Sequence, residues 1–308
     1  MESDLIAHFR KRTRTDHPAI EIGPGDDAAV LRLLGTDRFV VTVDLLTDHV
    51  DFELEKVDPR RVGHKALAVN LSDLAAMAAR PMGVVVAVAL PEKGGQRLAE
   101  ELVEGMLPLA ERFDSPIVGG DTNSWPGPLA ISITAFGTVT EHGPLTRSGA
   151  KPGDRILVTG RLGGSILGHH LDFIPRVDEA LLLNERYDLH AGIDISDGLS
   201  TDLNHLCEES GCGAVVQLAS IPISDAAREK QSKGGGTALD CALHDGEDFE
   251  LLLAVPPAEA EKLLADQPLG DVLLTEIGHF TEGSGLQTLD RSGKLEPLPP
   301  RGWEHRTT

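Results

Sequence analysis

The sequence is poor in aromatic residues, in basic residues and in long apolar runs. Phenylalanine, tyrosine and tryptophan make up 4% of the 308 residues, too few for the stacking platforms that bind single-stranded nucleic acid. The net charge of -21 would repel a phosphate backbone, so we expect no nucleic-acid partner. An acidic balance favours solubility and gathers cations, although a saline habitat would also produce it.

Cysteine is scarce as well. The three cysteines, Cys207, Cys212 and Cys241, contain no CxxC pair, which predicts reduced thiols in a cytoplasmic protein. Cys207 and Cys212 with His205 do not have a standard zinc spacing. No apolar run reaches about 18 residues and the N-terminus has no apolar signal core, so we expect neither export nor a membrane span.

The length and the element pattern predict two domains. A chain of 308 residues exceeds one typical domain, and the turn-rich segment 143–154 divides it into residues 1–142 and 143–308. Apolar strand patterns alternate with helical ones in both parts, which predicts an α/β fold. Residues 1–20 predict a short amphipathic helix, residues 231–237 a flexible loop, and residues 169–190 have no readable periodicity.

Residues 58–79 have the features of a buried helix. Asp58 suits the N-cap, Pro59 the first helical position, and Pro81 follows the predicted end. The segment is apolar on most sides, yet it carries Asp73, with Asn70 one turn earlier. An isolated buried charge is costly. Asp73 therefore caps a neighbouring backbone, pairs with Lys65 or an arginine, or binds a metal.

Four further aspartates follow apolar strands or stand in glycine turns: Asp27, Asp44, Asp121 and Asp194. Thr42 precedes Asp44 by two residues and therefore faces the same side of its strand. Sites built from several carboxylates select hard cations such as Mg²⁺. More acidic ligands than one ion needs indicate several ions, and clustered magnesium indicates phosphoryl transfer. The alternative for each aspartate is an ordinary surface turn or helix cap.

Two other segments have weaker signals for phosphate binding. Arg147 lies in the turn-rich segment and is a candidate phosphate clamp. The glycine-rich segment 159–165 matches neither a P-loop nor a GxGxxG fingerprint, so an ATP site would have to be built differently. Ser196 and Asp197 precede a predicted helix, where an acidic residue is also an ordinary cap.

In their order along the chain, these motifs resemble those of the thiamine-monophosphate kinases. The helix motif at residues 70–77 and the run at residues 145–154 are specific to these enzymes within a superfamily that includes aminoimidazole ribonucleotide synthetase. The match extends from about Glu21 to Trp303. The other matching stretches are Gly25-Asp26-Asp27, Thr42-Val43-Asp44, Gly119-Gly120-Asp121, residues 194–198 and residues 246–250.

The resemblance implies a fold, a reaction and a partner. The fold is the two-domain aminoimidazole ribonucleotide synthetase-like fold, α/β with mixed sheets and packed helices. Residues 1–142 would bind metal and ATP and form a homodimer, and residues 143–308 would form the second α/β domain. The reaction is the ATP-dependent phosphorylation of thiamine monophosphate to thiamine diphosphate. It proceeds by direct in-line transfer, so no residue acts as a covalent nucleophile.

The resemblance also assigns residues to roles. Several magnesium ions would be held by Asp27, Thr42, Asp44, Asp73, Asp121, Asp194 and Asp197. ATP would be bound by Gly120, Asp121, Arg147 and Ser196. Thiamine monophosphate would be bound by Asp51, Glu247 and Trp303, with Trp303 stacking on the aromatic rings.

One departure from the family pattern concerns the acceptor. The family usually has a His-Phe pair seven residues after the strand-end aspartate, where this chain has Asp51-Phe52. An acidic side chain would repel a phosphate but could suit a cation. The alternatives are a related ATP-dependent enzyme with another acceptor, a non-catalytic metal- or nucleotide-binding relative, and an acidic protein whose carboxylates only cover its surface.

Overall fold

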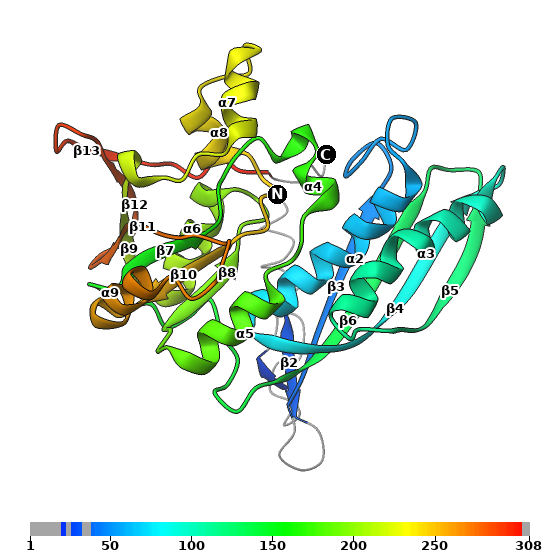
Figure 1. Cartoon of the computed structure of the whole chain (residues 1–308), viewed down its shortest axis with the longest axis horizontal. Coiled ribbons are helices and arrows are strands. Elements are labelled where there is room, and N and C mark those ends of the chain that lie inside the picture. Colours follow the sequence, from blue (N-terminus) through cyan, green and yellow to red (C-terminus); the bar gives the residue numbers. More distant parts are fainter. Residues whose placement is uncertain (1–19, 23–25, 33–37, 304–308) are drawn as a thin grey trace.

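The computed structural model describes residues 20–22, 26–32 and 38–303; the expected helix at residues 1–20 and the glycine turn at residues 23–25 lie outside these. The described chain forms two sheets with helices packed on them (Figure 1). The predicted α/β fold with mixed sheets and packed helices is therefore confirmed. No helix in this part of the chain combines the length and the apolar character needed to cross a membrane.

The first sheet has the strand order β1-β2-β3-β6-β4-β5. Its strands are β1 (Ile20–Ile22), β2 (Ala29–Arg32), β3 (Arg38–Thr47), β4 (Ala79–Pro91), β5 (Ile117–Trp125) and β6 (Ala130–Val139). The helices of this half are α2 (Pro59–Ala76) and α3 (Gly95–Arg112).

The second sheet has the strand order β13-β12-β9-β11-β7-β10-β8. Its strands are β7 (Arg155–Thr159), β8 (Ala191–Asp194), β9 (Gly213–Gln217), β10 (Leu251–Val255), β11 (Leu274–Thr281), β12 (Gly285–Leu289) and β13 (Leu295–Pro297). The helices of this half are α4 (His169–Asp172), α5 (Val177–Arg186), α6 (Leu199–Ser210), α7 (Asp225–Ser232), α8 (Ala238–His244) and α9 (Pro257–Asp266), with short 3-10 turns η1 (Ser165–Leu167) and η2 (Leu218–Ser220).

Helix α2 begins as the sequence predicts and ends earlier. The Asp58 carboxylate accepts the backbone N–H of Arg60 at 2.9 Å, which caps the helix. The helix stops at Ala76 because Ala78 adopts a left-handed φ of 48° that turns the chain directly into β4. β4 therefore includes Pro81, which is tolerated because β5 pairs only from Val84 onward.

Helix α2 is buried between the two halves of the molecule. It packs on α3 and on β3, β6 and β4 of the first sheet, and its other side contacts α4, α5 and β8 (Figure 1). Glycines allow α2 and α3 to approach each other most closely. A Cβ atom at Gly63 would overlap the carbonyl oxygen of Leu102, and one at Gly105 would overlap that of Arg60. The two helices are therefore in backbone contact.

Some helices were not predicted. Residues 169–190, which have no clear periodicity, contain α4 and α5. Helix α5 buries Val177, Ala180 and Leu183, one residue per turn, and packs on α2. The predicted loop at residues 231–237 begins inside α7, and its three glycines follow that helix. Short helices with one narrow apolar stripe give little sequence signal.

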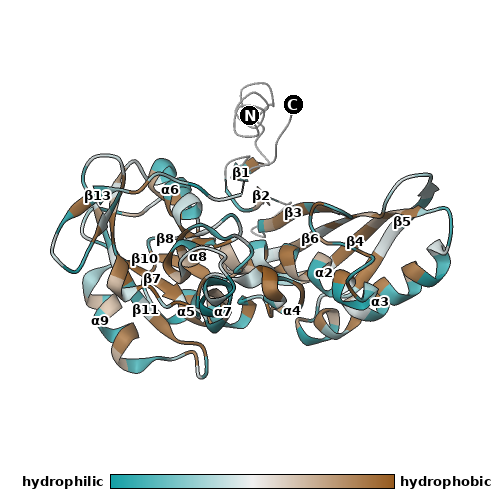
Figure 2. Cartoon of the chain, turned by 90° about the horizontal axis from the view of Figure 1, so that it is seen from above, coloured by the Kyte–Doolittle hydropathy of each residue, from teal (hydrophilic) through white to brown (hydrophobic). Residues whose placement is uncertain are grey.

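One face of the first sheet is covered by α2 and α3, and the opposite face is not covered by any described helix (Figure 2). On this outer face Val43 is 61% exposed and Leu45 is 64% exposed. On the neighbouring strand β6 they lie opposite Thr134 and Ser132, whose side chains point to the same face. An apolar sheet face of this kind is unusual in an isolated molecule and is typical of an interface.

We expect Gly63→Ala to lower the free energy of unfolding by about 2 kcal/mol or more, because the new methyl group would separate α2 from α3. Urea unfolding measures this. Gly119→Ala is the matched control: its Cβ would have only the Cγ1 of Val85 nearby, at 3.9 Å, and we expect a change within about 0.5 kcal/mol. Equal effects of the two substitutions would show that the helices do not depend on this contact.

Candidate active site

Three of the predicted ligands converge at the junction of the two halves. Carboxylate oxygens of Asp27, Asp73 and Asp194 all lie within 4.8 Å of one another. They come from the segment before β2, from the last turn of α2 and from the end of β8. The hydroxyl of Thr42 donates to Asp73, and that of Ser72 donates to Asp194 at 2.5 Å. These hydroxyls fix the direction in which the two carboxylates point.

Asp44 stands beside this group on β3. Its backbone N–H donates to the side-chain oxygen of Asn70 at 3.2 Å, which ties the strand to α2. Its Oδ2 atom is buried and has no hydrogen-bond partner among the described residues. A buried carboxylate oxygen without a donor is costly. The atom is therefore placed where a cation would satisfy it.

Burial and mutual repulsion raise the pKa values of these carboxyl groups. The pKa of Asp73 is raised well above its usual value, first by burial and then by the charges of Asp44, Asp194 and Asp27. Burial, followed by the charge of Asp27, raises the pKa of Asp194 to about 8. Burial, followed by the charge of Asp51, raises the pKa of Asp44 to about 6. These carboxyl groups resist losing their protons unless a positive charge arrives.

Arg147 provides a cation within the group. Its Nη2 and Nε atoms donate to the two oxygens of Asp27 at 2.7 and 3.0 Å, a bidentate pair in which the Asp27 side chain is 1% exposed. Its backbone N–H donates to Asp26 at 3.0 Å. The predicted phosphate clamp therefore contacts a predicted metal ligand. One guanidinium cannot offset four neighbouring carboxylates, so the donor set fits divalent cations.

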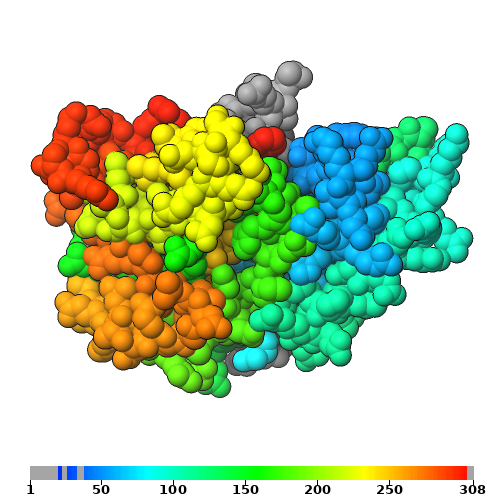
Figure 3. All heavy atoms as spheres, turned by 45° about the horizontal axis from the view of Figure 1, so that its top comes forward, coloured from blue at the N-terminus to red at the C-terminus, as the bar shows by residue number. Residues whose placement is uncertain are grey.

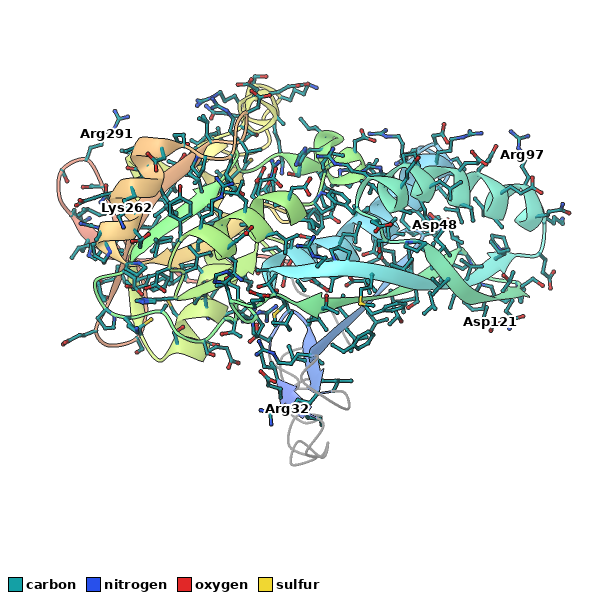
Figure 4. All side chains as sticks on the ribbon, turned by 60° about the horizontal axis from the view of Figure 1, so that its bottom comes forward. Arg32, Asp48, Arg97, Asp121, Lys262 and Arg291 are labelled. Atoms are coloured by element: carbon teal, nitrogen blue, oxygen red, sulfur yellow. The ribbon has the colours of Figure 1, made fainter. Side chains whose placement is uncertain are left out.

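Asp121 and Gly120 do not join this group within one chain. β5 pairs with β4 so that Asp121 lies opposite Ala87, which in turn lies opposite Ser132 on the outer face. Asp44 pairs with Ile133, on the helix-covered face. Asp121 therefore lies on the opposite face of the sheet from Asp44. It is three strands away from Asp44, at the exposed edge of the sheet (Figure 4). Within one chain Asp121 therefore does not join the other four aspartates, and its role in binding metal and ATP stays a prediction.

Gly120 has a packing role that its position explains. A Cβ atom there would overlap the backbone oxygen of Val86 on β4. The close contact of two strand backbones thus requires this glycine, whether or not a ligand is bound.

Asp197 lies in a second acidic group. Its carboxylate, that of Asp202 and the imidazole of His205 offer atoms within 4.8 Å of one another. Asp202, inside α6, accepts the N–H groups of Asp197 and Gly198 at 3.1 and 2.9 Å and so fixes the turn before the helix. Among the described residues no side chain caps the N-terminus of α6, so the capping alternative for Asp197 is wrong, and its metal role stays a prediction.

A pocket of about 550 Å³ adjoins the aspartates. It is lined by the three predicted acceptor residues, Asp51, Glu247 and Trp303, and by Asp44 and Ser196. Trp303 is 56% exposed, and its backbone N–H donates to the carbonyl of Asp197 at 2.9 Å. In Figure 3 a red part of the C-terminal segment lies between the yellow helices α7 and α8 and the blue first half. The pocket therefore has walls from both halves.

Lys65 also lines this pocket. The expectation that Lys65 might pair with Asp73 is wrong: its side chain, 1% exposed, forms an ion pair with Glu247 and donates to the carbonyl oxygen of Asp51 at 2.7 Å. A lysine in the middle of an apolar helix is the signal that could have drawn attention to it. Its partner could not be identified from sequence, because Glu247 is 182 positions away.

Comparison with known proteins identifies relatives of the whole chain. Residues 25–139 match the model of the AIR synthase related protein, N-terminal domain, and residues 151–290 match that of the C-terminal domain. Thiamine-monophosphate kinase of Rhodopirellula baltica is 40% identical over 100% of this chain and 98% of its own length. That of Escherichia coli K12 is 36% identical over the same shares.

Solved structures agree with these relatives. The structure of AaThiL complexed with AMPPCP and TMP is similar with a TM-score of 0.84 and 28% identity, over 99% of this chain and 97% of that chain. Thiamine-monophosphate kinase from Stenotrophomonas maltophilia is similar with a TM-score of 0.75 and 36% identity, over 92% and 95% of the two chains.

We expect the metal-free protein to lose stability as the pH rises from about 4 to 8. Asp44 and Asp194 keep their protons in the folded state up to pKa values of about 6 and 8, whereas they ionise near pH 3.8 in the unfolded chain. The folded state thus binds more protons, so this contribution is full below pH 3.8 and is lost as the pH passes the folded values. Melting curves after EDTA treatment, at pH 5 and pH 8, measure it.

Adding Mg²⁺ at pH 8 should reverse the loss and raise the melting temperature by about 5 °C at saturating concentrations. Asp194→Asn removes one ligand and one buried charge, so we expect a smaller loss with pH and a smaller response to Mg²⁺. An equal Mg²⁺ response in both proteins would contradict metal binding at this group.

Proposed function

Because the chain belongs to the thiamine-monophosphate kinases of the AIR synthase related family, we infer that it transfers the γ-phosphoryl group of ATP to thiamine monophosphate and forms thiamine diphosphate. The observation that carries this proposal is the adjacency of two sites. The pocket that contains the predicted acceptor residues extends to Asp44, one of the buried aspartates. A donor and an acceptor bound there would meet with their phosphates at the carboxylate group, as direct in-line transfer requires.

We propose that Asp27, Thr42, Asp44, Asp73 and Asp194 hold several magnesium ions. Magnesium bound there would supply positive charge to the phosphate oxygens. The donor-free Oδ2 of Asp44 and the raised pKa values of Asp73 and Asp194 support this assignment, because a cation would satisfy that oxygen and offset the repulsion between the carboxylates. Asp197 would belong to a further ion at its own acidic group.

The chain's own residues would then act by positioning. Arg147 can exchange its bidentate pair with Asp27 for a bidentate contact with a nucleotide phosphate, once metal offsets the Asp27 charge. Ser196 lines the same pocket as the predicted acceptor residues, where its hydroxyl can bind a phosphate. AaThiL is complexed with AMPPCP, a nucleoside triphosphate analogue, which supports ATP as the donor.

The acceptor pocket suits a flat, positively charged ring system. Trp303 offers an exposed indole for stacking, and Asp51 and Glu247 bring carboxylates into the same pocket. Thiamine monophosphate has a cationic thiazolium ring and a pyrimidine ring, so its rings would be attracted to these groups. Its phosphate would extend toward Asp44 and the metal ions.

We also propose that two copies pair through the outer face of the first sheet. Val43 and Leu45 give that face an apolar surface, and Asp121 lies on it. Asp121 and Gly120 would then serve the site of the partner, where Asp121 would bind metal and both would contact ATP. A cytoplasmic location is part of the proposal: Cys207, Cys212 and Cys241 are free and buried.

The second candidate is a relative of this family with another acceptor, and the substitution at Asp51 favours it. A coupled assay of ADP release separates the two, with Mg-ATP and either thiamine monophosphate, thiamine or no acceptor. We expect ADP and thiamine diphosphate with the monophosphate only. Bound ATP by calorimetry without turnover on thiamine monophosphate would reject the proposed reaction.

Asp73→Asn should reduce turnover by about 10³-fold or more, because it removes a buried metal ligand beside Asp27 and Asp194. The fold should persist, since the amide keeps the size of the carboxylate and can still accept from Thr42. Circular dichroism and the coupled assay are the measurements. The exposed Asp266→Asn serves as the control with unchanged turnover. Near-normal activity of Asp73→Asn would mean that the aspartates do not hold the metal.

Mixing two inactive variants tests the dimer. In a heterodimer of Asp73→Asn and Asp121→Asn chains, one site would combine both substitutions and the other would be intact. Random mixing should then restore about a quarter of wild-type activity. If Asp121 acted within its own chain, every site would have one substitution and no activity would return.

A further inference from the structure

Lys65 joins the two walls of the acceptor pocket. It lies on α2 and is almost fully buried. Its ammonium group donates to the carbonyl oxygen of Asp51 at 2.7 Å, in the loop after β3, and forms an ion pair with Glu247 from the other half of the molecule. One side chain therefore contacts both predicted acceptor-binding carboxylate residues.

We propose that Lys65 is a positioning residue that sets the spacing and the charge of the acceptor pocket. The inference rests on the proposed function, because it concerns how that pocket selects an acceptor combining a cationic ring with a phosphate monoester. Lys65 lines the pocket but its side chain is only 1% exposed, and its ammonium group is bound to Asp51 and Glu247, so it acts through these two residues.

The backbone of Glu247 shows why such a residue is needed. Glu247 adopts a left-handed φ of 64°, which side chains with a Cβ rarely adopt. Its backbone N–H donates to Ser196 at 2.6 Å. The neighbouring Asp245 and Asp248 are fixed to the amides of Gly164 and Gly163, within the second half. Glu247 reaches across to α2, where Lys65 holds its carboxylate.

The opposite wall is fixed in a similar way. The Asp51 carboxylate accepts the backbone N–H of Thr47 at 2.6 Å, and that of Asp48 accepts the N–H of Leu54 at 2.9 Å. These bonds close the loop on itself, and the bond from Lys65 to Asp51 attaches it to α2. Loss of Lys65 would release both walls while their internal bonds remained.

The charge of Lys65 matters as much as its hydrogen bonds. Asp44, Asp51, Asp197, Asp245 and Glu247 all line this pocket. Lys65 offsets Glu247 and leaves the carboxylate of Asp51 to face the ring cation. Without Lys65 the pocket gains one net negative charge, which would repel the phosphate of the acceptor.

The test is Lys65→Met, which keeps an unbranched side chain of similar length and removes the charge. We expect the KM for thiamine monophosphate to rise about tenfold or more, while the KM for ATP changes less than about twofold and kcat per active site falls less than the acceptor KM rises. The control is Lys56→Met, which removes an exposed lysine that pairs with Glu53 in the same region. It should have wild-type constants.

A double variant separates positioning from general stability. Glu247→Gln alone should raise the acceptor KM, and adding Lys65→Met should multiply it by much less than in the wild-type background, because the shared interaction is already lost. If Lys65→Met does not fold, Lys65→Gln replaces it, since an amide can still donate to the carbonyl of Asp51.

The outcomes are distinct. No turnover of thiamine monophosphate by the wild-type protein overturns the proposed function itself. A wild-type protein that turns over, together with a Lys65→Met variant of lowered melting temperature and unchanged acceptor KM, overturns the positioning role alone. Independent, multiplicative effects of Lys65→Met and Glu247→Gln would also overturn it.

Discussion

The structure depends on the burial of several carboxylates side by side. Asp27, Asp73 and Asp194 lie within reach of one ion, and Asp44 is next to them. Like charges at this distance in a poorly hydrated place disfavour folding unless protons or cations offset them. The same residues link the two halves, since Ser72 bonds Asp194 and Arg147 bonds Asp27. Interdomain packing and the proposed cation binding therefore depend on the same carboxylates.

Much of this arrangement follows from local sequence signals. The cap and the proline of α2 set its start, and an aspartate after an apolar strand is directed to the strand's end. Because these aspartates follow buried elements, their convergence could be predicted. The position of Asp121 could not, because the face on which a strand residue lies depends on register. Its pairing with Ala87 sets that register, and a shift of one residue would reverse the face.

Contacts between residues that are far apart in the sequence could not be predicted either. Lys65 is unusual in an apolar helix, but nothing in its own segment or in that of Glu247 indicates that the two side chains meet. The same holds for α4 and α5, whose apolar residues have meaning only against α2. Such contacts gain their stability from the assembled core, which propensity and periodicity do not describe. The sequence thus indicated the residues Asp51, Glu247 and Trp303, but it could not predict the shape of the pocket that they line together.

The backbone contact between α2 and α3 has a mechanical consequence. At Gly63 and Gly105 the two helices have no side chain between them, so neither can slide along the other without steric overlap. Helix α2 is consequently held in place on α3, and it carries the carboxylate of Asp73 and the ammonium group of Lys65. Any movement of α2 relative to the second half of the chain would therefore carry α3 with it.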